Sequence, residues 1–416
     1  MGETLGLYIS VPFCRAKCTY CNFASGVFPA SDYGRYVVRL CGELQGARER
    51  AEREGWLLPE RVGSVYLGGG TPSTLEPERL REIFAAIQGS FVIEPGAEIT
   101  VECAPGQIAP EFLQAMVEVS ATRVSLGVQS LVDAEAAATG RMHTRAIVEQ
   151  DVRRLRDARL AVNADLIAGL PGQTMASWRE SVEALCGLGV QHASLYMLEV
   201  DEDSRLGREL IGGGARYGAG LVPVDDVIAA MYEVGCERLE RAGLRQYEIS
   251  NFARPDAESR HNLRYWRREP YLGVGLDAHS MLRRGDDGAA GFGNGVAGFG
   301  NIVRFGNTND LAGYLAGETE GDVERVDCAA ELEEAWFLGL RLVEGVSPTA
   351  LRSEFGAEAI AAFDGVVAEL IADRLLAREG ERVALTMRGR MLSNEVFGRF
   401  LGITSPEQAR LALSTQ

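Results

Sequence analysis

The segment Cys14-Arg-Ala-Lys-Cys18-Thr-Tyr-Cys21 decides how this chain is interpreted. It places three thiols within eight residues, directly after the strand-like run Leu5–Ser10. A structural zinc site is normally closed by four ligands, and the next cysteine and histidine along the chain are the distant Cys41 and His143. Iron–sulfur clusters are commonly held by four thiolates. Three cysteines on one loop therefore predict a [4Fe-4S] cluster with one iron left open.

Strand-like and helical stretches alternate through the first half of the chain around that loop. This pattern predicts right-handed crossovers and a parallel sheet. A closed eight-unit barrel takes about 250 residues, whereas the alternation fades near residue 230 after six units. We therefore expect an α/β fold with a partial, TIM-like (β/α)6 barrel. The six strand-like runs are Leu5–Ser10, Ser64–Leu67, Glu98–Val101, Arg123–Leu126, Ala161–Ile167 and Ala193–Leu198.

Polar or glycine-rich residues follow most of these strands. Gly68–Pro72 comes after the second strand, Glu102 ends the third and Gln129 follows the fourth. Asp165 lies in the fifth strand, which runs into the segment Gly169–Gly172. Functional residues of closed barrels lie on the loops after the carboxyl ends of the strands. We therefore expect the site at that end of the sheet, beside the three cysteines.

The second half of the chain predicts a sheet extension and a further domain. Gln246–Phe252 and Tyr271–Ser280 are strand-like and are expected to extend the sheet, while Gly288–Gly300 indicates a flexible surface loop. From about residue 328 the pattern is helical, with a short strand at Arg382–Thr386, which predicts a small, mainly helical, winged-helix-like domain. The expected domains are the barrel over 1–230, the sheet extension over 231–315 and the C-terminal domain over 316–416.

Composition excludes several classes of function. No run approaches the ~18 apolar residues of a transmembrane segment, and the first residues lack the pattern of a secretory signal. The net charge of −17 argues against nucleic-acid binding, which needs a basic surface. We therefore expect a cytoplasmic protein. The remaining cysteines are scattered and are predicted to be small buried residues rather than disulfides: Cys41, Cys103, Cys186, Cys236 and Cys328.

The cysteine spacing resembles the signature C-x3-C-x-aromatic-C of the radical S-adenosylmethionine (SAM) superfamily, with Tyr20 at the aromatic position. In that superfamily the open iron binds the amino and carboxylate groups of SAM and passes an electron to its sulfonium. Over nearly its full length the chain is similar to the coproporphyrinogen-oxidase-related subgroup. The stretches that carry this similarity are Leu7–Cys14, Gly68–Ser73, Ser125–Ser130, Gly140–His143 and Asn163–Gly172.

The resemblance implies a set of SAM-binding residues. Glu102 would accept from the ammonium group, Arg141 would pair with the carboxylate, and Gln129 and Asp165 would hold the ribose hydroxyls. Relatives usually have histidine at the position of Ser10, and serine cannot take over a proton-handling role there. No catalytic residue is assigned. The complete implied set is Tyr8, Tyr20, Gly69, Gly70, Thr71, Glu102, Gln129, Arg141 and Asp165.

Two functions are open within this subgroup. An oxygen-independent coproporphyrinogen III oxidase uses the SAM-derived radical to decarboxylate propionates, whereas a HemW-type heme chaperone binds heme and delivers it to acceptor proteins. The oxidase has a fourth cysteine after the third, where this chain has Asn22-Phe23, and it has a longer extension before Cys14. Arg260–Trp266 resembles the H-N-x-x-Y-W motif by which the chaperones are proposed to bind heme. These features favour the chaperone, while the retained SAM residues leave catalysis open.

By this resemblance heme binds at His261, Asn262, Tyr265 and Trp266. Histidine is a common axial ligand, and the two aromatic rings offer flat apolar surface. The alternative is that His261 forms hydrogen bonds within the protein while the rings pack on the barrel. His279, in a second family motif, is the other candidate ligand. The expected partners are heme and heme-accepting proteins, and a reductant protein and a second copy of the chain are further candidates.

Overall fold

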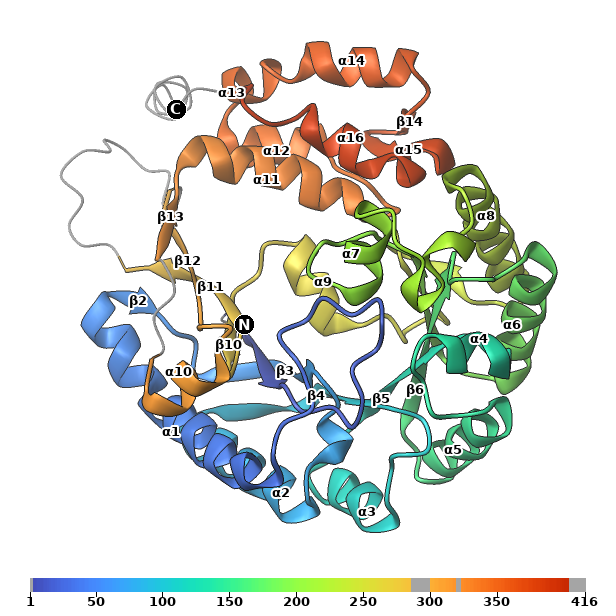
Figure 1. Ribbon diagram of the computed structural model, residues 1–416. Coiled ribbons are helices and arrows are strands. Elements are labelled where there is room, and N and C mark those ends of the chain that lie inside the picture. The colour runs from blue at the N-terminus through green and yellow to red at the C-terminus, as the bar shows by residue number, and fades with distance from the viewer. Residues whose placement is uncertain (1–2, 286–299, 319–322, 404–416) are drawn as a thin grey trace.

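The computed structural model describes residues 3–285, 300–318 and 323–403. Six strands of its sheet are parallel to one another and lie side by side in chain order (Figure 1). All six predicted strands are thereby confirmed, most of them longer than predicted. The strands are β1 (Leu5–Val11), β3 (Arg61–Gly69), β4 (Val92–Cys103), β5 (Arg123–Gln129), β6 (Ala161–Ala168) and β7 (His192–Met197).

Helices cover the outer face of this sheet, while the segment after β1 crosses in front of the strand ends (Figure 1). They are held by apolar side chains at helical spacing, such as Leu80, Ile83, Phe84 and Ile87 of α2. No helix within the described residues is long and apolar enough to cross a bilayer. The helices of this part are α1 (Ala30–Glu54), η1 (Pro72–Thr74), α2 (Pro77–Ser90), α3 (Pro110–Glu118), α4 (Asp133–Ala138), α5 (Arg145–Asp157), α6 (Met175–Leu188), α7 (Arg205–Ile211), η2 (Arg216–Leu221) and α8 (Asp225–Arg241).

The two predicted extension pieces do extend the sheet, but at opposite edges. β9 (Asn251–Ala253) pairs antiparallel with β7 and carries β8 (Arg245–Gln246) outside it. β10 (Tyr271–Val274) pairs parallel with β1 at the other edge. The chain changes edges through α9 (Arg260–Trp266), which carries the predicted heme motif. The edge beside β1 is completed by β11 (His279–Arg284), β12 (Ile302–Gly306), β13 (Glu324–Val326), the short β2 (Trp56–Leu57) and α10 (Leu311–Ala316).

The C-terminal helices have a hydrophobic cluster of their own. The ring of Trp336 stacks on Phe363 and Phe400 there, with centroids 5.7 and 5.3 Å away. A two-stranded antiparallel hairpin supplies the expected wing. After this hairpin the chain forms two short helices, because Leu392 between them has non-helical dihedral angles. The elements are α11 (Cys328–Arg341), α12 (Pro348–Phe355), α13 (Ala357–Ala361), α14 (Asp364–Ala372), β14 (Leu376–Glu379), β15 (Arg382–Leu385), α15 (Met387–Met391) and α16 (Ser393–Gly398).

Two other expectations concern the domains and the cysteines. The boundaries at residues 230 and 315 stay predictions, and the glycine-rich loop lies, apart from Gly300, outside the described residues. All eight cysteines are free, as expected for a chain without disulfides. Three of the scattered ones are buried, but Cys41 and Cys186 are only half-buried, so the expectation of burial is wrong for these two.

Candidate functional site

The cysteine loop follows β1, and backbone contacts join its two ends. Phe13 and Gly26 form an isolated parallel bridge, and the amide of Cys14 donates to the carbonyl of Gly26 over 2.8 Å. The buried ring of Phe13 stacks on Tyr33, with centroids 3.9 Å apart. The cysteines therefore lie on a loop whose two ends are held together over the carboxyl end of the first strand.

The three cysteine side chains line one cavity of about 650 Å³. The hydroxyl of Thr71 donates to the Cys14 sulfur over 3.6 Å, and the Cys21 sulfur lies 3.8 Å from the hydroxyl oxygen of Ser25. Burial raises the pKa of the Cys14 thiol. Among the described residues no three cysteine, histidine or acidic side chains already converge as a metal site. The three cysteines thus line a common cavity, whose lining also includes Cys103 on β4.

The glycine segment after β3 lies against the backbone of the cysteine loop. The amide of Gly70 donates to the carbonyl of Val11, and that of Thr71 to the carbonyl of Phe13, both over 2.8 Å. A Cβ atom on Gly70 would lie 2.6 Å from the oxygen of Val11 and 2.8 Å from the carbonyl carbon of Pro12. The absence of a side chain at residue 70 is therefore what allows the two loops to meet.

Two buried carboxyl groups line the inner wall of the cavity. Glu102 on β4 accepts from the hydroxyl of Tyr66 over 2.7 Å, and burial, with a smaller contribution from the charge of Asp165, raises its pKa to about 7. Asp165 on β6 accepts from the amide of Asn163 over 2.7 Å, and burial raises its pKa as well. Both groups would gain from a cationic or hydrogen-bond-donating ligand, because a buried anion without a partner is costly.

Gln129 and Arg141 complete this wall. Gln129 has a left-handed backbone (φ 68°) at the end of β5, and its side-chain oxygen is buried with no hydrogen-bond partner in the described structure. The guanidinium of Arg141 donates to the hydroxyl of Tyr20 over 3.2 Å. It also lies close to the backbone of Gly127, because a Cβ atom on Gly127 would be 2.9 Å from a guanidinium nitrogen of Arg141. Strained backbone and unsatisfied buried polar atoms are typical of ligand sites.

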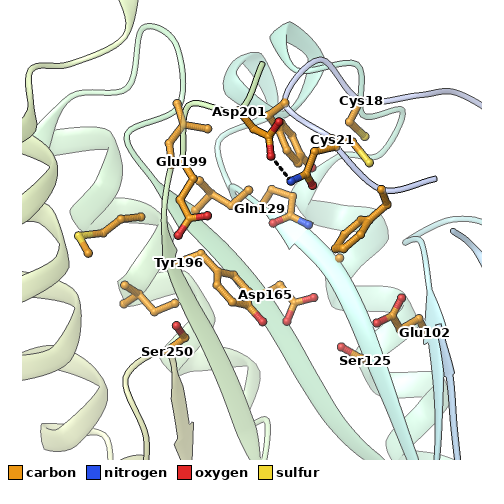
Figure 2. A pocket seen from close by; sticks show the side chains of 18 of the residues that line it. Cys18, Cys21, Glu102, Ser125, Gln129, Asp165, Tyr196, Glu199, Asp201 and Ser250 are labelled. Carbon is orange, nitrogen blue, oxygen red and sulfur yellow. Dashed lines mark hydrogen bonds between the residues drawn. The ribbon is translucent and has the colours of Figure 1, made fainter. Parts of the chain in front are cut away.

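Nearly all the predicted cluster and SAM residues meet at this cavity. Figure 2 shows Glu102, Gln129 and Asp165 beneath Cys18 and Cys21, and every other member of the two predicted sets except Tyr8 also lines the cavity. Tyr8 faces a second pocket of about 310 Å³, which shares Gly69 and Phe23 with the large cavity. Ser10 and His279 line this second pocket too.

The outer wall of the large cavity contains residues that the sequence analysis did not identify. Tyr196 lies near the carboxyl end of β7 and Glu199 follows the strand (Figure 2), so the strand-end rule applied to the sixth strand would have found them. Arg341 and the segment 392–395 belong to the C-terminal helices and line the same cavity. No spacing or motif in the sequence connects these distant segments with the cysteine loop.

The predicted heme motif forms a helix that is tied to the barrel. The Glu98 carboxylate accepts from the amides of Arg260 and His261 over 3.1 and 3.0 Å. His261 is 1% exposed, with Nδ1 3.0 Å from the Ser64 hydroxyl and Nε2 2.9 Å from the Tyr265 hydroxyl. Burial, followed by the charge of Arg264, lowers the pKa of His261 to about 3.

The other members of the motif are also engaged with the protein. The guanidinium of Arg341 lies 4.2 Å above the ring of Trp266, and Arg264 donates to the carbonyl of Thr4 over 2.7 Å. Binding of heme iron by His261 would require the hydrogen bonds of its imidazole to break. The assignment of heme to His261, Asn262, Tyr265 and Trp266 stays a prediction.

Comparison with known proteins agrees with this architecture. Residues 8–185 match the model of the radical SAM superfamily, and residues 327–392 match that of the HemN C-terminal domain. The crystal structure of the Escherichia coli coproporphyrinogen III oxidase HemN, a radical SAM enzyme, has the same fold. It superposes with a TM-score of 0.78 at 19% identity, over 97% of this chain and 91% of HemN. The fold is thus that of a radical SAM protein, and this superfamily implies a [4Fe-4S] cluster and SAM as cofactors.

Relatives that match over nearly the full length of the chain identify its family within this superfamily. The heme chaperone HemW of Lactococcus lactis is 32% identical over 398 residues, which cover 95% of this chain and 96% of that protein. The heme chaperone HemW of Mycobacterium tuberculosis is 34% identical over 412 residues, covering 96% of each. The chain belongs to the HemW family.

We predict that Gly70→Ala disrupts the cysteine loop. Its Cβ would displace the backbone around Val11 and Pro12, so the free energy of unfolding should fall by about 1–3 kcal/mol, as for other overpacked sites. The amount of iron that the Gly70→Ala variant binds after anaerobic reconstitution should also fall. Gly89→Ala is the matched control, because a Cβ there meets nothing within 4 Å and the residue lies in α2. Equal iron content in the two variants would contradict the assignment.

Proposed function

We propose that this chain is a heme chaperone of the radical SAM type, which holds a [4Fe-4S] cluster, SAM and heme and delivers heme to acceptor proteins. The observation that carries the proposal is similarity over nearly the whole chain to proteins named heme chaperones. The cysteine loop supports it, because the residue after Cys21 is Asn22, whose amide donates to Asp201 over 2.5 Å. Asn22 thus ties this loop to the segment after β7 instead of supplying a fourth thiol.

The residues present fit the two cofactors of the superfamily. Cys14, Cys18 and Cys21 offer three thiolate donors to the cluster on one short loop that lines the cavity. Gly69 and Gly70 line the same cavity and place no side chain in it. When bound, the cluster and SAM supply one-electron reductive chemistry at the SAM sulfonium.

The polar residues of the inner wall match the groups of SAM. Glu102 receives the ammonium and Arg141 the carboxylate, because each is a buried charge of opposite sign. Asp165 and the unpaired oxygen of Gln129 accept from the ribose hydroxyls. The other residues we assign to SAM are Tyr8, Tyr20, Gly69, Gly70 and Thr71.

The expected partners and location belong to the same proposal. Heme-accepting proteins receive the cargo, and a reductant protein supplies electrons from outside the chain; a second copy of the chain is a further candidate partner. We place the protein in the cytoplasm, where thiols stay reduced, because all eight of its cysteines are free.

The cluster assignment is tested by replacing its three ligands. Anaerobically reconstituted protein should hold about four irons per chain and show a broad cluster absorption. Both should disappear when Cys14, Cys18 and Cys21 are changed to alanine. A control variant with Cys41→Ala and Cys186→Ala removes two partly exposed thiols elsewhere and should keep the iron. A full cluster in the first variant would refute the assignment.

SAM binding should depend on pH through Glu102. The pKa of its carboxyl group in the free protein is about 7, so the group is mostly protonated below that pH and cannot pair with the ammonium. Affinity measured by calorimetry should rise as the pH increases towards 7 and level off above it. Glu102→Gln should weaken binding and remove this dependence. Glu43→Gln, which changes another buried acid with a raised pKa, should preserve it.

The chaperone and the oxidase make opposite predictions. Heme added to the full chain should produce a Soret band that saturates. Coproporphyrinogen III, SAM and a reductant should yield no protoporphyrinogen IX, with a coproporphyrinogen III oxidase as positive control. Formation of that product at a rate on the order of 1 s⁻¹, ordinary for an enzyme, would overturn the choice of the chaperone.

A further inference from the structure

We propose that His279, in the smaller pocket beside the cluster cavity, supplies the imidazole that binds the iron of the heme. This inference rests on the proposed function and names the site at which the cargo is held. It assigns a structural role to His261, the histidine that the sequence motif favours.

The pocket has the character of a site for a flat apolar ligand. Its lining includes Tyr8 and Ser10 of β1, Tyr265 of α9, Tyr271 of β10, and Leu276, Asp277 and His279 beside them. Aromatic surface with a few polar groups is typical of cofactor pockets. Its volume of about 310 Å³ is at the small end of such sites. A tetrapyrrole would therefore be only partly enclosed, which suits a cargo that has to be passed on.

The side chain of His279 is exposed, whereas that of His261, the other candidate ligand, is buried. Its side chain is 72% exposed, and Nε2 lies 4.0 Å from a carboxylate oxygen of Asp277. No hydrogen bond to its imidazole is present within the described part of the chain. The ring occupies the space beside Gly306, where a Cβ would lie 2.8 Å from Nδ1. A free imidazole with a carboxylate nearby is a common arrangement for a metal-binding histidine.

The other three histidines are engaged in the interior. Both ring nitrogens of His261 have hydroxyl partners, as described above. In His192, Nδ1 lies 2.6 Å from the side-chain oxygen of Asn163 and Nε2 lies 2.9 Å from the hydroxyl of Tyr247. His143 is 5% exposed, and its Nε2 lies 3.1 Å from the carbonyl of Val128. Of the four, His279 alone combines an exposed side chain with a place in the lining of this pocket, within the described structure.

A tight turn places this pocket against the cluster cavity. Gly275, after β10, has a φ of 101°, and its missing Cβ would lie 2.6 Å from the carbonyl oxygen of Ser10. The turn is thereby held at the carboxyl end of β1, where the cysteine loop begins. Gly69 and Phe23 form walls of both spaces. A heme bound through His279 would thus be a direct neighbour of the SAM and cluster site.

The test titrates the full-length protein with heme and, separately, with metal-free protoporphyrin IX. His279→Ala should weaken heme binding by about tenfold or more and shift the Soret band. It should leave the metal-free porphyrin nearly unaffected, since that ligand forms no axial bond. Added imidazole should restore the band position. Tyr271→Ala, which removes a pocket wall, should weaken both ligands. His261→Gln, which keeps polar atoms near Ser64 and Tyr265, is the matched control and should retain the wild-type spectrum.

Two results would overturn the inference. If the wild-type protein binds heme and His279→Ala gives the same affinity and spectrum, while His261→Gln loses them, the iron ligand is His261 and the proposed function stands. If His279→Ala loses heme and metal-free porphyrin equally, the side chain does not act as an iron ligand. Absence of heme binding by the wild-type protein would instead overturn the proposed function itself.

Discussion

The site depends on the register between β1 and β3. Ser10 pairs with Gly68 and Val11 with Gly69 in parallel strands, so the cysteine loop and the glycine loop leave the sheet at the same edge and height. The amides of the glycine loop then bond to the carbonyls that precede the cysteines. A slip of this register by one residue would reverse the faces of the side chains. The position of the three thiols is therefore set by the ladder of the core.

Buried charged groups line the inner wall of the large cavity. Glu102, Asp165 and Arg141 lie in one wall, and the two carboxyl groups have raised pKa values because burial disfavours their charged forms. Such groups are costly unless they are paired. An amino-acid ligand, which carries an ammonium and a carboxylate, can pair with both signs in one binding event. The side-chain oxygen of Gln129, which has no hydrogen-bond partner among the described residues, is a further polar group that such a ligand would satisfy.

Helix α9, which carries the predicted heme motif, connects the two edges of the sheet and is hydrogen-bonded to strands of the barrel. Its first turn bonds to Glu98 of β4, and its histidine bonds to Ser64 of β3. The tyrosine of the same motif reaches the second pocket, while the tryptophan lies beneath Arg341 of the C-terminal helices. One short sequence motif therefore has both a structural and a ligand-facing part. The motif alone does not distinguish them, because residue spacing carries no information about which side chains find partners in the interior.

The sequence by itself predicted the six parallel strands and the end of the sheet that carries the cysteine loop. It also predicted Glu102, Gln129 and Asp165 at the strand ends, whereas Arg141 followed only from the family resemblance. Local periodicity, glycine positions and the cysteine spacing are properties of contiguous residues, so Cys14, Gly70 and Glu102 were identifiable without coordinates. The tertiary structure alone decided that the two extension pieces lie at opposite sheet edges, that Arg341 and residues 392–395 close the cavity, and that His261 is enclosed while His279 is open. These features depend on contacts between segments far apart in the chain, and burial and hydrogen-bond partners are settled only when those segments pack.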